Sequence, residues 1–444
     1  MSSKRLIIIG GVAAGPSAAF KAKRVKPDLE VILFTEEEDL SYGSCGLPYF
    51  ISGIIGDRKK LVARTVKAFT DAGIDVRLKT RVEGVDSKEG VVFAGGEKFS
   101  YDSLIIATGA SPIIPPFEGK DLEGVFTLRS VKDGERIRDF ISKESPEKAV
   151  IVGAGYIGVE MAESFAELGL KVSLVELMPQ ILINMDADMA ELVERELKAK
   201  GVEVLTSTKV LGFEGRERVE RVITDKGDIN TDLVLLAIGV KPNSELAKEA
   251  GLALGPKGAI DVNRRMETSV PGIYAAGDCA DAFHLVSGKK VYIPLGTTAN
   301  KQGRIAGNNA AGGEYAVFPG VVGTAIAKVF DLEIARTGLS SVEADKEGFS
   351  FKSALIKSRT AAGYYPGASS IAVKLLAEEK TGRIIGGQIV GGRGSGMRIN
   401  AIAMAVSNGM RIWEFAYADL AYAPPFSPVW DPLLVAGPKL LREF

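Results

Sequence analysis

The sequence predicts an α/β fold with two Rossmann-like units, each a β-α-β repeat. Residues 6–36 and 149–176 follow one pattern: an apolar strand, a glycine-rich turn, an alanine-rich helix, a second apolar strand and an acidic residue. Such alternation of strand and helix is typical of parallel sheets covered by helices. At 444 residues the chain is also too long for one hydrophobic core, and its length suggests about three domains.

The bulk composition excludes several classes of protein. With 46% hydrophobic residues, 25% charged residues and a net charge of -1, the chain has no overall field that would attract nucleic acid. No apolar run reaches the roughly 18 residues of a membrane span. The apolar run near the N-terminus ends at Gly10 after four residues, too few for a signal peptide. We therefore expect a cytoplasmic protein without nucleic-acid or membrane partners.

The chain has few residues for metal or disulfide chemistry. Its two cysteines, Cys45 and Cys279, cannot form a disulfide framework, and its one histidine, His284, cannot build a zinc cluster or a triad with histidine as base. We expect no metal site. The low cysteine count also favours the cytosol.

The first repeat departs from the usual glycine pattern. Its strand runs into Gly10-Gly11 and the turn closes at Gly15, with Val12 where a middle glycine is expected, so the backbone would approach a phosphate through Gly11. After the second strand, either Thr35 or Glu36 would meet the ribose. We favour Glu36, and the alternative is a solvated acidic turn.

The second repeat carries a complete GxGxxG, formed by Gly153, Gly155 and Gly158, then a helix over 159–168 and a strand over 171–175. The first glycine permits the tight turn, the second lets the backbone approach a pyrophosphate, and the third packs helix against strand. The phosphates then lie at the helix N-terminus. Glu176 stands where it would bind ribose hydroxyls. Because residues 177–185 contain no Arg or Lys, a 2'-phosphate would lack a counter-charge, which favours NADH over NADPH.

Two further strands end in a glycine turn, over 104–110 and 272–278. Taken alone, either of them is simply a core strand that meets a loop. The residues concerned are Ala107, Thr108 and Gly109 in the first, and Gly277 and Asp278 in the second.

Cys45 follows the first repeat without a partner cysteine nearby. Flavin enzymes that reduce disulfides usually carry a resolving cysteine five positions on, and here that position is Phe50. A catalytic Cys45 would need a second sulfur from the substrate, or it would cycle through a sulfenic acid. A helix beginning after Cys45 would lower its thiol pKa. The alternative is a small buried hydrophobic residue, which is our expectation for Cys279.

Together these motifs resemble a known family. The order GGxxxG, ATG, GxGxxG, AIG and AAGD is similar to the FAD-dependent pyridine-nucleotide disulfide oxidoreductases over essentially the whole chain. SYGSCGLP at 41–48, with the segments 363–367 and 419–427, resembles the coenzyme A-disulfide reductase branch. The resemblance implies an FAD domain over 1–112 and 251–320, an NADH domain over 113–250, and an α+β domain over 321–444 that forms a homodimer.

The resemblance also implies which residues bind the cofactors. Those expected to bind FAD are Gly10, Gly11, Gly15, Glu36, Ala107, Thr108, Gly109, Gly277, Asp278 and Thr298. Those expected to bind NADH are Gly153, Gly155, Gly158, Glu176 and Gly239. The helix that starts near Thr298 would direct its positive end at the reduced flavin ring.

The implied reaction is reduction of CoA disulfide through a Cys45–S–S–CoA intermediate, with Ser41 and Ser44 beside the substrate. Tyr422 and either Tyr364 or Tyr365 would give a proton to the departing thiolate. Strand alternation favours Tyr364, and the alternative is that all three are interface or core aromatics. In relatives these tyrosines reach across the dimer interface.

Coenzyme A carries several phosphates, so a group of basic residues is expected near Cys45. The alternative is a solvated helix face or loop. The candidates are Lys21, Lys23 and Arg24 on the first helix, and Arg58, Lys59, Lys60 and Arg64 after the cysteine segment; we favour Lys21, Arg24 and Arg64, with Tyr365 as a further substrate contact.

Three other functions remain open. Persulfide or polysulfide reduction uses the same thiol. NADH oxidases of this family carry a histidine that corresponds to Ala13 here, so a sulfenate at Cys45 would lack one stabilising hydrogen bond. A non-catalytic nucleotide-sensing protein could keep both dinucleotide folds, and the Cys45 motif argues against it.

Overall fold

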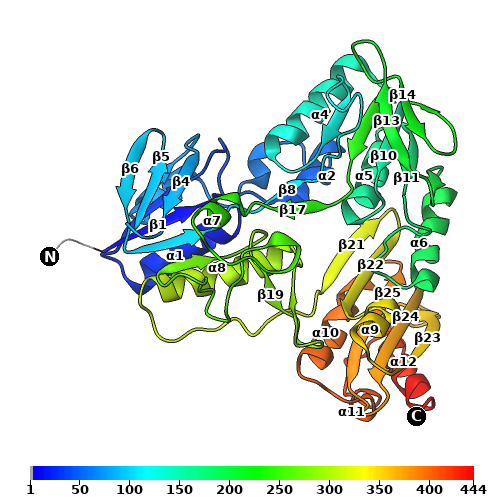
Figure 1. Ribbon diagram of the computed structural model, residues 1–444. Coiled ribbons are helices and arrows are strands. Elements are labelled where there is room, and N and C mark those ends of the chain that lie inside the picture. Colours follow the sequence, from blue (N-terminus) through cyan, green and yellow to red (C-terminus); the bar gives the residue numbers. More distant parts are fainter. Residues whose placement is uncertain (1–3) are drawn as a thin grey trace.

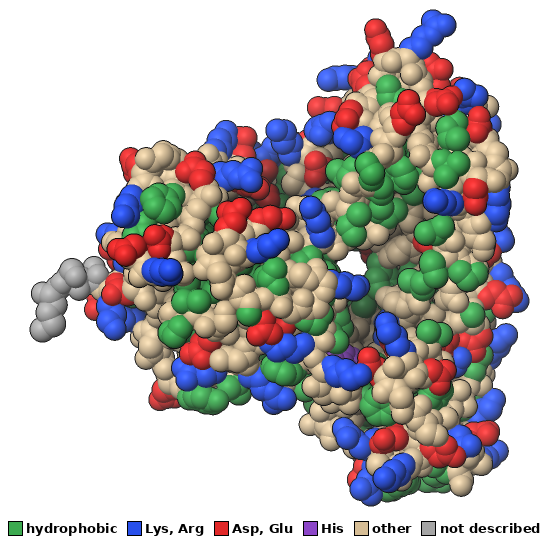
Figure 2. Space-filling model, in the orientation of Figure 1, with side chains coloured by type: hydrophobic (Ala, Val, Ile, Leu, Met, Phe, Trp, Pro, Cys, Tyr) green, Lys and Arg blue, Asp and Glu red, His purple; other side chains and the backbone are tan. Residues whose placement is uncertain are grey.

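The structure, a computed structural model, describes residues 4–444. The chain forms three lobes (Figure 1), and the space-filling view shows an opening between them (Figure 2). Each lobe has its own sheet, and apolar side chains gather on the side of the second lobe that faces this opening (Figure 2). Within the described residues, no helix is long and apolar enough to cross a bilayer.

The first lobe is built on a parallel sheet with the strand order β18-β7-β1-β2-β3. Its strands are β1 (Arg5–Ile9), β2 (Glu30–Phe34), β3 (Ile74–Arg77), β7 (Ser103–Ile106) and β18 (Ile273–Ala275). β18 joins this sheet although it follows the whole second sheet in the chain. Helices α1 (Ala14–Val25) and α8 (Gly296–Ala310) pack against each other and against the sheet.

Smaller elements complete the first lobe. A three-stranded antiparallel sheet, one hairpin and three short helices surround the main sheet and the cysteine segment. They are β4 (Val82–Asp86), β5 (Val91–Ala94), β6 (Glu97–Ser100), β19 (Ala282–Phe283), β20 (Lys290–Val291), α2 (Leu47–Ile51), α3 (Val66–Asp71) and α7 (Glu245–Glu249).

The second lobe repeats the Rossmann arrangement, with the parallel order β12-β11-β10-β16-β9. Its strands are β9 (Val125–Thr127), β10 (Lys148–Val152), β11 (Lys171–Val175), β12 (Glu203–Leu205) and β16 (Leu233–Leu236), and its helices are α4 (Val131–Glu144), α5 (Tyr156–Glu167) and α6 (Ala187–Ala199). A small antiparallel sheet follows β12, made of β13 (Val210–Glu214), β14 (Arg221–Thr224) and β15 (Ile229–Asn230). The antiparallel pair β8 (Ala110–Pro112) and β17 (Val240–Pro242) connects the first two lobes (Figure 1).

The third lobe has an antiparallel sheet with the order β21-β22-β25-β24-β23. The strands are β21 (Ala325–Val329), β22 (Leu332–Gly338), β23 (Phe351–Arg359), β24 (Ser370–Glu378) and β25 (Ile384–Gly391), with helices α9 (Ser341–Glu347), α10 (Ile399–Ser407), α11 (Ile412–Phe415) and α12 (Pro432–Leu441). Two Rossmann-like sheets and this third sheet confirm the predicted fold class, and the predicted residue limits of the domains stay a prediction.

Buried charges fasten the second lobe to the third. Asp186, just before α6, is 4% exposed, and its carboxylate accepts hydrogen bonds from the Ser341 amide (2.8 Å) and pairs with Lys374 Nζ (2.8 Å). Burial raises the pKa of Asp186, but the hydrogen bonds from Lys374 and Ser341 outweigh burial and hold this pKa below its usual value. Lys328 on β21 pairs with buried Glu163 on α5. With the pKa of Asp186 lowered and that of Lys374 raised, the Asp186–Lys374 pair stays charged at neutral pH.

Candidate active site

The two glycine turns have the same geometry. Gly10 (φ 118°) and Gly153 (φ 101°) both lie in the region that side chains disfavour. A Cβ on Gly153 would approach the Ala237 carbonyl oxygen to 2.5 Å, and one on Gly10 would collide with the Ala107 carbonyl. Each glycine turn therefore packs against the end of the neighbouring strand in its sheet, β7 for the first turn and β16 for the second. This contact places the predicted segments 107–109 and 237–239 beside the two turns.

The third glycine of each turn packs helix against strand. A Cβ on Gly15 would collide with the Gly10 carbonyl, and one on Gly158 would collide with the Gly153 carbonyl. The middle glycines of the two turns, Gly11 and Gly155, differ in their surroundings. A Cβ on Gly155 would meet open space, whereas one on Gly11 would come within 2.9 Å of the Thr35 and Leu40 side chains. Gly155 thus leaves its backbone open to a ligand, while Gly11 is needed for packing inside the protein.

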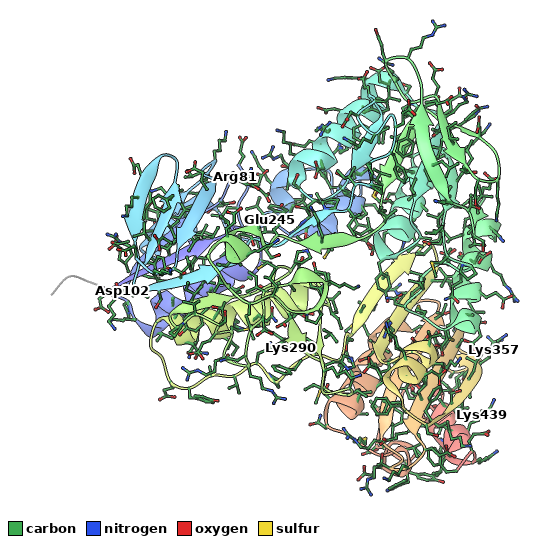
Figure 3. The ribbon with its side chains drawn as sticks, viewed as in Figure 1. Arg81, Asp102, Glu245, Lys290, Lys357 and Lys439 are labelled. Carbon is green, nitrogen blue, oxygen red and sulfur yellow. The ribbon has the colours of Figure 1, made fainter. Side chains whose placement is uncertain are left out.

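The strand register distinguishes Thr35 from Glu36. Ile9 pairs with Phe34 in the first sheet as Val152 pairs with Val175 in the second, so Thr35 occupies the position of Glu176. Thr35 is buried, whereas Glu36 is exposed and lies 3.9 Å from Arg81, which Figure 3 places on the outer edge of the first lobe. The register therefore favours Thr35 over our preferred Glu36 at the strand end.

Glu176 faces its glycine turn. Its carboxylate accepts hydrogen bonds from the backbone amides of Ala154 (2.8 Å) and Met178 (2.9 Å). This places a negative charge where a nucleotide ribose would lie on the Gly153–Gly158 turn, and the same charge helps to hold the turn in place.

Asp278 lies at the end of the first sheet in a polar cluster. Burial raises its pKa, and the guanidinium of Arg129, at 4.0 Å, opposes that rise. The preceding Gly277 donates its backbone amide to Gln302 Oε1 (2.9 Å), and Gln302 is fully buried on α8. Thr298 is also buried, one turn earlier on α8.

Arg129 and Gln302 were absent from the sequence prediction. Arg129 lies between β9 and α4, and its Nε donates to the Ala110 carbonyl (2.6 Å) in the first lobe. No local motif marks this residue, because only the packing of two lobes brings it to Asp278. Gln302 lies at helical spacing after Thr298, which was the only available signal.

Cys45 lies in a single 3-10 turn, Ser44–Gly46, that leads directly into α2. It is exposed, whereas Phe50 on α2 is 4% exposed. The Ser164 hydroxyl on α5 donates to the Pro48 carbonyl (3.1 Å) and ties the cysteine segment to the second lobe. Cys279 is fully buried, as expected, and its thiol points to the Ile106 carbonyl (3.4 Å).

The expected low pKa of Cys45 is contradicted by its surroundings. Although the residue is exposed, the atoms packed around the thiol remove part of its hydration and raise the pKa; the carboxylates of Glu160 and Asp278 raise it further, and a hydrogen bond with Ser44 opposes them. The helix α2 has only five residues, so its dipole is small. Glu160 itself has a pKa raised to about 7 by burial and by neighbouring Glu163.

Ser41 and Ser44 differ in their surroundings. Ser41 is buried with φ 52°, and its backbone joins the Gly11 carbonyl (2.8 Å) to the Ala63 amide (2.7 Å). Ser44 is partly exposed beside Cys45, and its side chain acts to lower the pKa of the thiol. Ser41 therefore holds the cysteine loop against the first glycine turn, and Ser44 borders the thiol.

Several of the basic residues predicted to bind CoA have partners within the chain. Lys23 donates to two backbone carbonyls in the connection between α1 and β2 (2.6 and 3.0 Å). Arg58 pairs with two carboxylates (2.6 and 2.7 Å). Arg24 donates to the Phe20 carbonyl (3.2 Å), and the Arg64 guanidinium lies 4.9 Å from the centre of the Phe20 ring. The other members, on α1 and on the turn at 58–61, are Lys21, Lys59 and Lys60.

The positions of Tyr364 and Tyr365 contradict the expectation that strand alternation separates them. Tyr364 and Tyr365 lie in the turn between β23 and β24, not in a strand, so strand alternation does not choose between them. The Pro366-Gly367 pair, with Gly367 at φ 84°, makes this turn. Tyr364 is 78% exposed, and its hydroxyl is near enough to that of Tyr422 to raise the pKa of Tyr422. Tyr364 follows β23 and Tyr422 lies between α11 and α12, all in the third lobe, whereas Cys45 directly precedes α2, which lies apart from that lobe (Figure 1).

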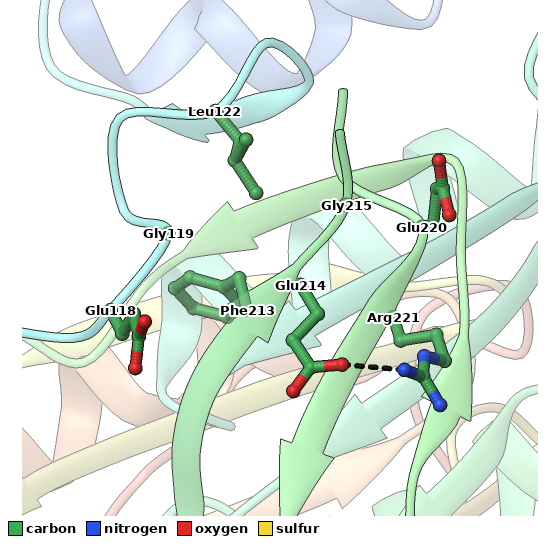
Figure 4. Close-up of a pocket in the computed structure, with 8 residues that line it drawn as sticks. All are labelled: Glu118, Gly119, Leu122, Phe213, Glu214, Gly215, Glu220 and Arg221. Carbon is green, nitrogen blue, oxygen red and sulfur yellow. Dashed lines mark hydrogen bonds and ion pairs between the residues drawn. The ribbon is translucent and has the colours of Figure 1, made fainter. Parts of the chain in front are cut away.

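One surface hollow lies away from the residues predicted to form the site. It lies between the connection before β9 and the hairpin β13-β14, where Glu214 pairs with Arg221 at 2.5 Å (Figure 4). Its lining contains none of the predicted site residues. No cluster of three or more metal-ligating side chains occurs in residues 4–444.

Comparison with known proteins gives matches along the chain. The family model described as pyridine nucleotide-disulphide oxidoreductase matches residues 4–303, and the one described as its dimerisation domain matches residues 324–432. A "NAD(P)H sulfur oxidoreductase (CoA-dependent)" of Pyrococcus furiosus is 44% identical over 98% of both chains. An "NADH oxidase" of Methanocaldococcus jannaschii is 40% identical over 99% of both. The crystal structure of reduced Bacillus anthracis CoADR-RHD is 35% identical, with a TM-score of 0.96 over 100% of this chain and 81% of that one.

Proposed function

The chain belongs to the pyridine nucleotide-disulphide oxidoreductase family, in its coenzyme A-disulfide reductase branch, and from this premise we propose that it reduces CoA-bound persulfide or polysulfide sulfur with electrons from NAD(P)H. FAD relays the electrons, as is typical of the family. Cys45 carries the sulfur chemistry. The 44% identity to a CoA-dependent sulfur oxidoreductase supports this acceptor over CoA disulfide, the acceptor expected from the sequence.

One observation carries the proposal: Cys45 is an exposed thiol without a second thiol to resolve it. Phe50 fills the usual resolving position and is buried, and Cys279 is completely buried in the first lobe. A mixed disulfide at Cys45 therefore has no internal thiol to attack it. The second sulfur must come from the substrate.

The proposed steps follow from thiol exchange. The Cys45 thiolate attacks the CoA-bound sulfur of a CoA persulfide; a Cys45–S–S–CoA bond forms, the substrate S–S bond breaks, and hydrosulfide leaves. Two electrons from NAD(P)H then reduce this disulfide, a transfer that FAD would mediate when bound in the first lobe. The Cys45 thiolate and the CoA thiol are regenerated, the thiol taking the proton that NAD(P)H oxidation releases, so each persulfide consumes one NAD(P)H.

The residues present fit FAD and a nicotinamide nucleotide. The first lobe offers the Gly10–Gly15 turn and the cluster of Asp278 and Arg129, and the second offers Gly155, whose missing side chain leaves open space. We propose that Asp278 accepts hydrogen bonds from FAD hydroxyls and that Thr298, Thr108 and Gly239 border the cofactors. Glu176 would bind the ribose hydroxyls of NADH and disfavour a 2'-phosphate.

We further propose that the chain works as a homodimer. The dimerisation-domain match covers 324–432, and the third lobe exposes large apolar side chains there, among them Tyr364 (78%), Tyr417 (70%) and Phe426 (75%). The hydroxyls of Tyr364 and Tyr422 would enter the partner subunit's Cys45 site and give a proton to the leaving thiolate.

CoA disulfide is the second candidate acceptor, because attack by Cys45 would give the same Cys45–S–S–CoA intermediate and one free CoA. Structural likeness to CoADR-RHD supports it. Oxygen is the third, since one relative is called an NADH oxidase. Ala13, at the N-terminus of α1, offers a sulfenate no polar side chain.

Anaerobic NADH consumption by the purified protein tests the proposal. CoA persulfide, inorganic polysulfide with and without CoA, and CoA disulfide are offered in parallel, with oxygen in a separate aerobic arm. We expect turnover to be fastest with CoA persulfide, and polysulfide turnover to require CoA. Equal polysulfide turnover without CoA, or faster turnover with oxygen than with any sulfur acceptor, would contradict the proposal.

A further inference from the structure

Tyr292 carries a hydroxyl that is buried and has no hydrogen-bond partner among the described residues. Such a group loses its hydration without compensation, at a cost of about 1–3 kcal/mol, so a partner is expected in the working protein. Tyr292 directly follows β20, two residues after Lys290, which Figure 3 labels on the lower side of the first lobe.

The strand pairing brings Tyr292 close to the segment that carries Asp278. Ala282 pairs with Val291, so Tyr292, the residue after β20, lies opposite Asp281, three positions after Asp278. The charges that act on the Tyr292 phenol agree with this placement: they come from Asp278, Cys279 and Arg129. Burial is the largest cause of its raised pKa, so the phenol keeps its proton at neutral pH and acts as a donor.

Asp278 and Arg129 form only a long ion pair, at 4.0 Å, and Arg129 uses its Nε on the Ala110 carbonyl. The Tyr292 phenol, a hydrogen-bond donor, is thus within electrostatic range of a carboxylate acceptor and a guanidinium. That set suits a chain of hydroxyl groups that ends in phosphate, because each hydroxyl both donates and accepts.

We propose that Tyr292 is a cofactor-positioning residue, whose hydroxyl donates a hydrogen bond to the hydroxylated chain of FAD beside Asp278. The inference rests on the proposed function, in that FAD occupies the first lobe. The sequence motifs at the glycine turns and strand ends could not have indicated Tyr292.

Tyr101 provides a matched control. Its hydroxyl is also buried without a partner, but it lies between β6 and β7, and the charge that acts on it comes from Asp86 on the outer hairpin. Tyr101→Phe therefore removes an equivalent atom away from Asp278.

The test compares wild type, Tyr292→Phe and Tyr101→Phe, each purified as holoenzyme, stripped of flavin and titrated with FAD. We expect Tyr292→Phe to weaken FAD binding about 5- to 20-fold, the value of one hydrogen bond, and Tyr101→Phe to leave it unchanged. Thermal melts separate binding from folding. Because the hydroxyl is unpartnered without FAD, Tyr292→Phe should not lower the Tm of the apoprotein, yet it should reduce the Tm gain on adding FAD.

Two results would overturn the inference: FAD affinity of Tyr292→Phe equal to wild type, or a lower apoprotein Tm with the full FAD-dependent gain, which would indicate a purely structural role. Wild-type protein that binds no FAD would instead remove the proposed function, and this inference with it.

Discussion

The reactivity of Cys45 depends on carboxylates from other parts of the chain. Glu160 lies on α5 of the second lobe and Asp278 follows β18 of the first, and both raise the pKa of the Cys45 thiol. With its own pKa at about 7, Glu160 is charged above pH 7 and largely neutral below it. Its effect on Cys45 is therefore greatest above pH 7.

Glu160→Gln should lower the pKa of Cys45, because it removes a negative charge that disfavours the thiolate. The rate of Cys45 alkylation by iodoacetamide, followed against pH, measures this. We expect the variant profile to move to lower pH, with faster alkylation at neutral pH. Glu167→Gln, an exposed change on the same helix, should leave the profile in place. A Glu160→Gln profile at or above that of wild type would refute the electrostatic link.

Glu176 has two roles that substitutions can separate. Glu176→Ala removes both the charge and the acceptors for the Ala154 and Met178 amides, and should raise the KM for NADH about tenfold, the value of one charged hydrogen bond. Glu176→Gln keeps one acceptor and loses the charge. Steady-state kinetics should show weaker discrimination against NADPH in both variants. An unchanged NADH-to-NADPH ratio in both would contradict the assignment.

At the scale of elements, the Gly153–Gly158 turn separates packing from binding. Gly158→Ala forces a Cβ against the Gly153 carbonyl and should cost at least about 1–3 kcal/mol of stability. Gly155→Ala places its Cβ in open space, with a backbone of φ -76° and ψ -171° that alanine tolerates. We expect Gly155→Ala to keep the wild-type Tm but bind NADH about tenfold more weakly, since phosphates approach the backbone there. Calorimetry and NADH titration measure the two. Full NADH affinity in Gly155→Ala would argue against a nucleotide at this turn.

The elements also show where prediction from sequence succeeds and where it ends. Both β-α-β repeats and their third glycines were predictable, because turn, strand and helix are local patterns. Thr35 could not be separated from Glu36 without the pairing of β1 with β2, since two adjacent residues follow the same strand. The prediction that Tyr364 lies in a strand was wrong, because a proline-glycine turn separates β23 from β24. Arg129 reaches Asp278, and Tyr292 comes to lie opposite Asp281, only through packing and strand pairing, which leave no periodic signal.

At the scale of the whole molecule, the two halves of the proposed chemistry lie in different lobes. Cys45 lies beside the second lobe, and the Tyr364-Tyr422 pair lies on the third. A dimer in which each chain completes its partner's site would reconcile these positions.

Mixing two inactive forms of the chain tests this arrangement. One form carries Cys45→Ser, and the other carries Tyr364→Phe with Tyr422→Phe. In mixed dimers, one site would combine an intact cysteine with intact tyrosines, so random exchange should restore about a quarter of wild-type activity. Activity after subunit exchange, compared with unmixed samples, measures it. No gain on mixing, although mixed dimers form, would place the tyrosines in their own chain's site or outside catalysis.

Mass spectrometry of the intact protein and of its peptides, after anaerobic incubation with CoA disulfide, tests most directly whether Cys45 forms the Cys45–S–S–CoA intermediate, which both CoA disulfide and CoA persulfide would give. We expect one CoA bound per chain, on the peptide that contains Cys45, released when NADH is added, and no adduct in Cys45→Ser. Absence of a Cys45 adduct, or an adduct that NADH does not remove, would contradict this role of Cys45.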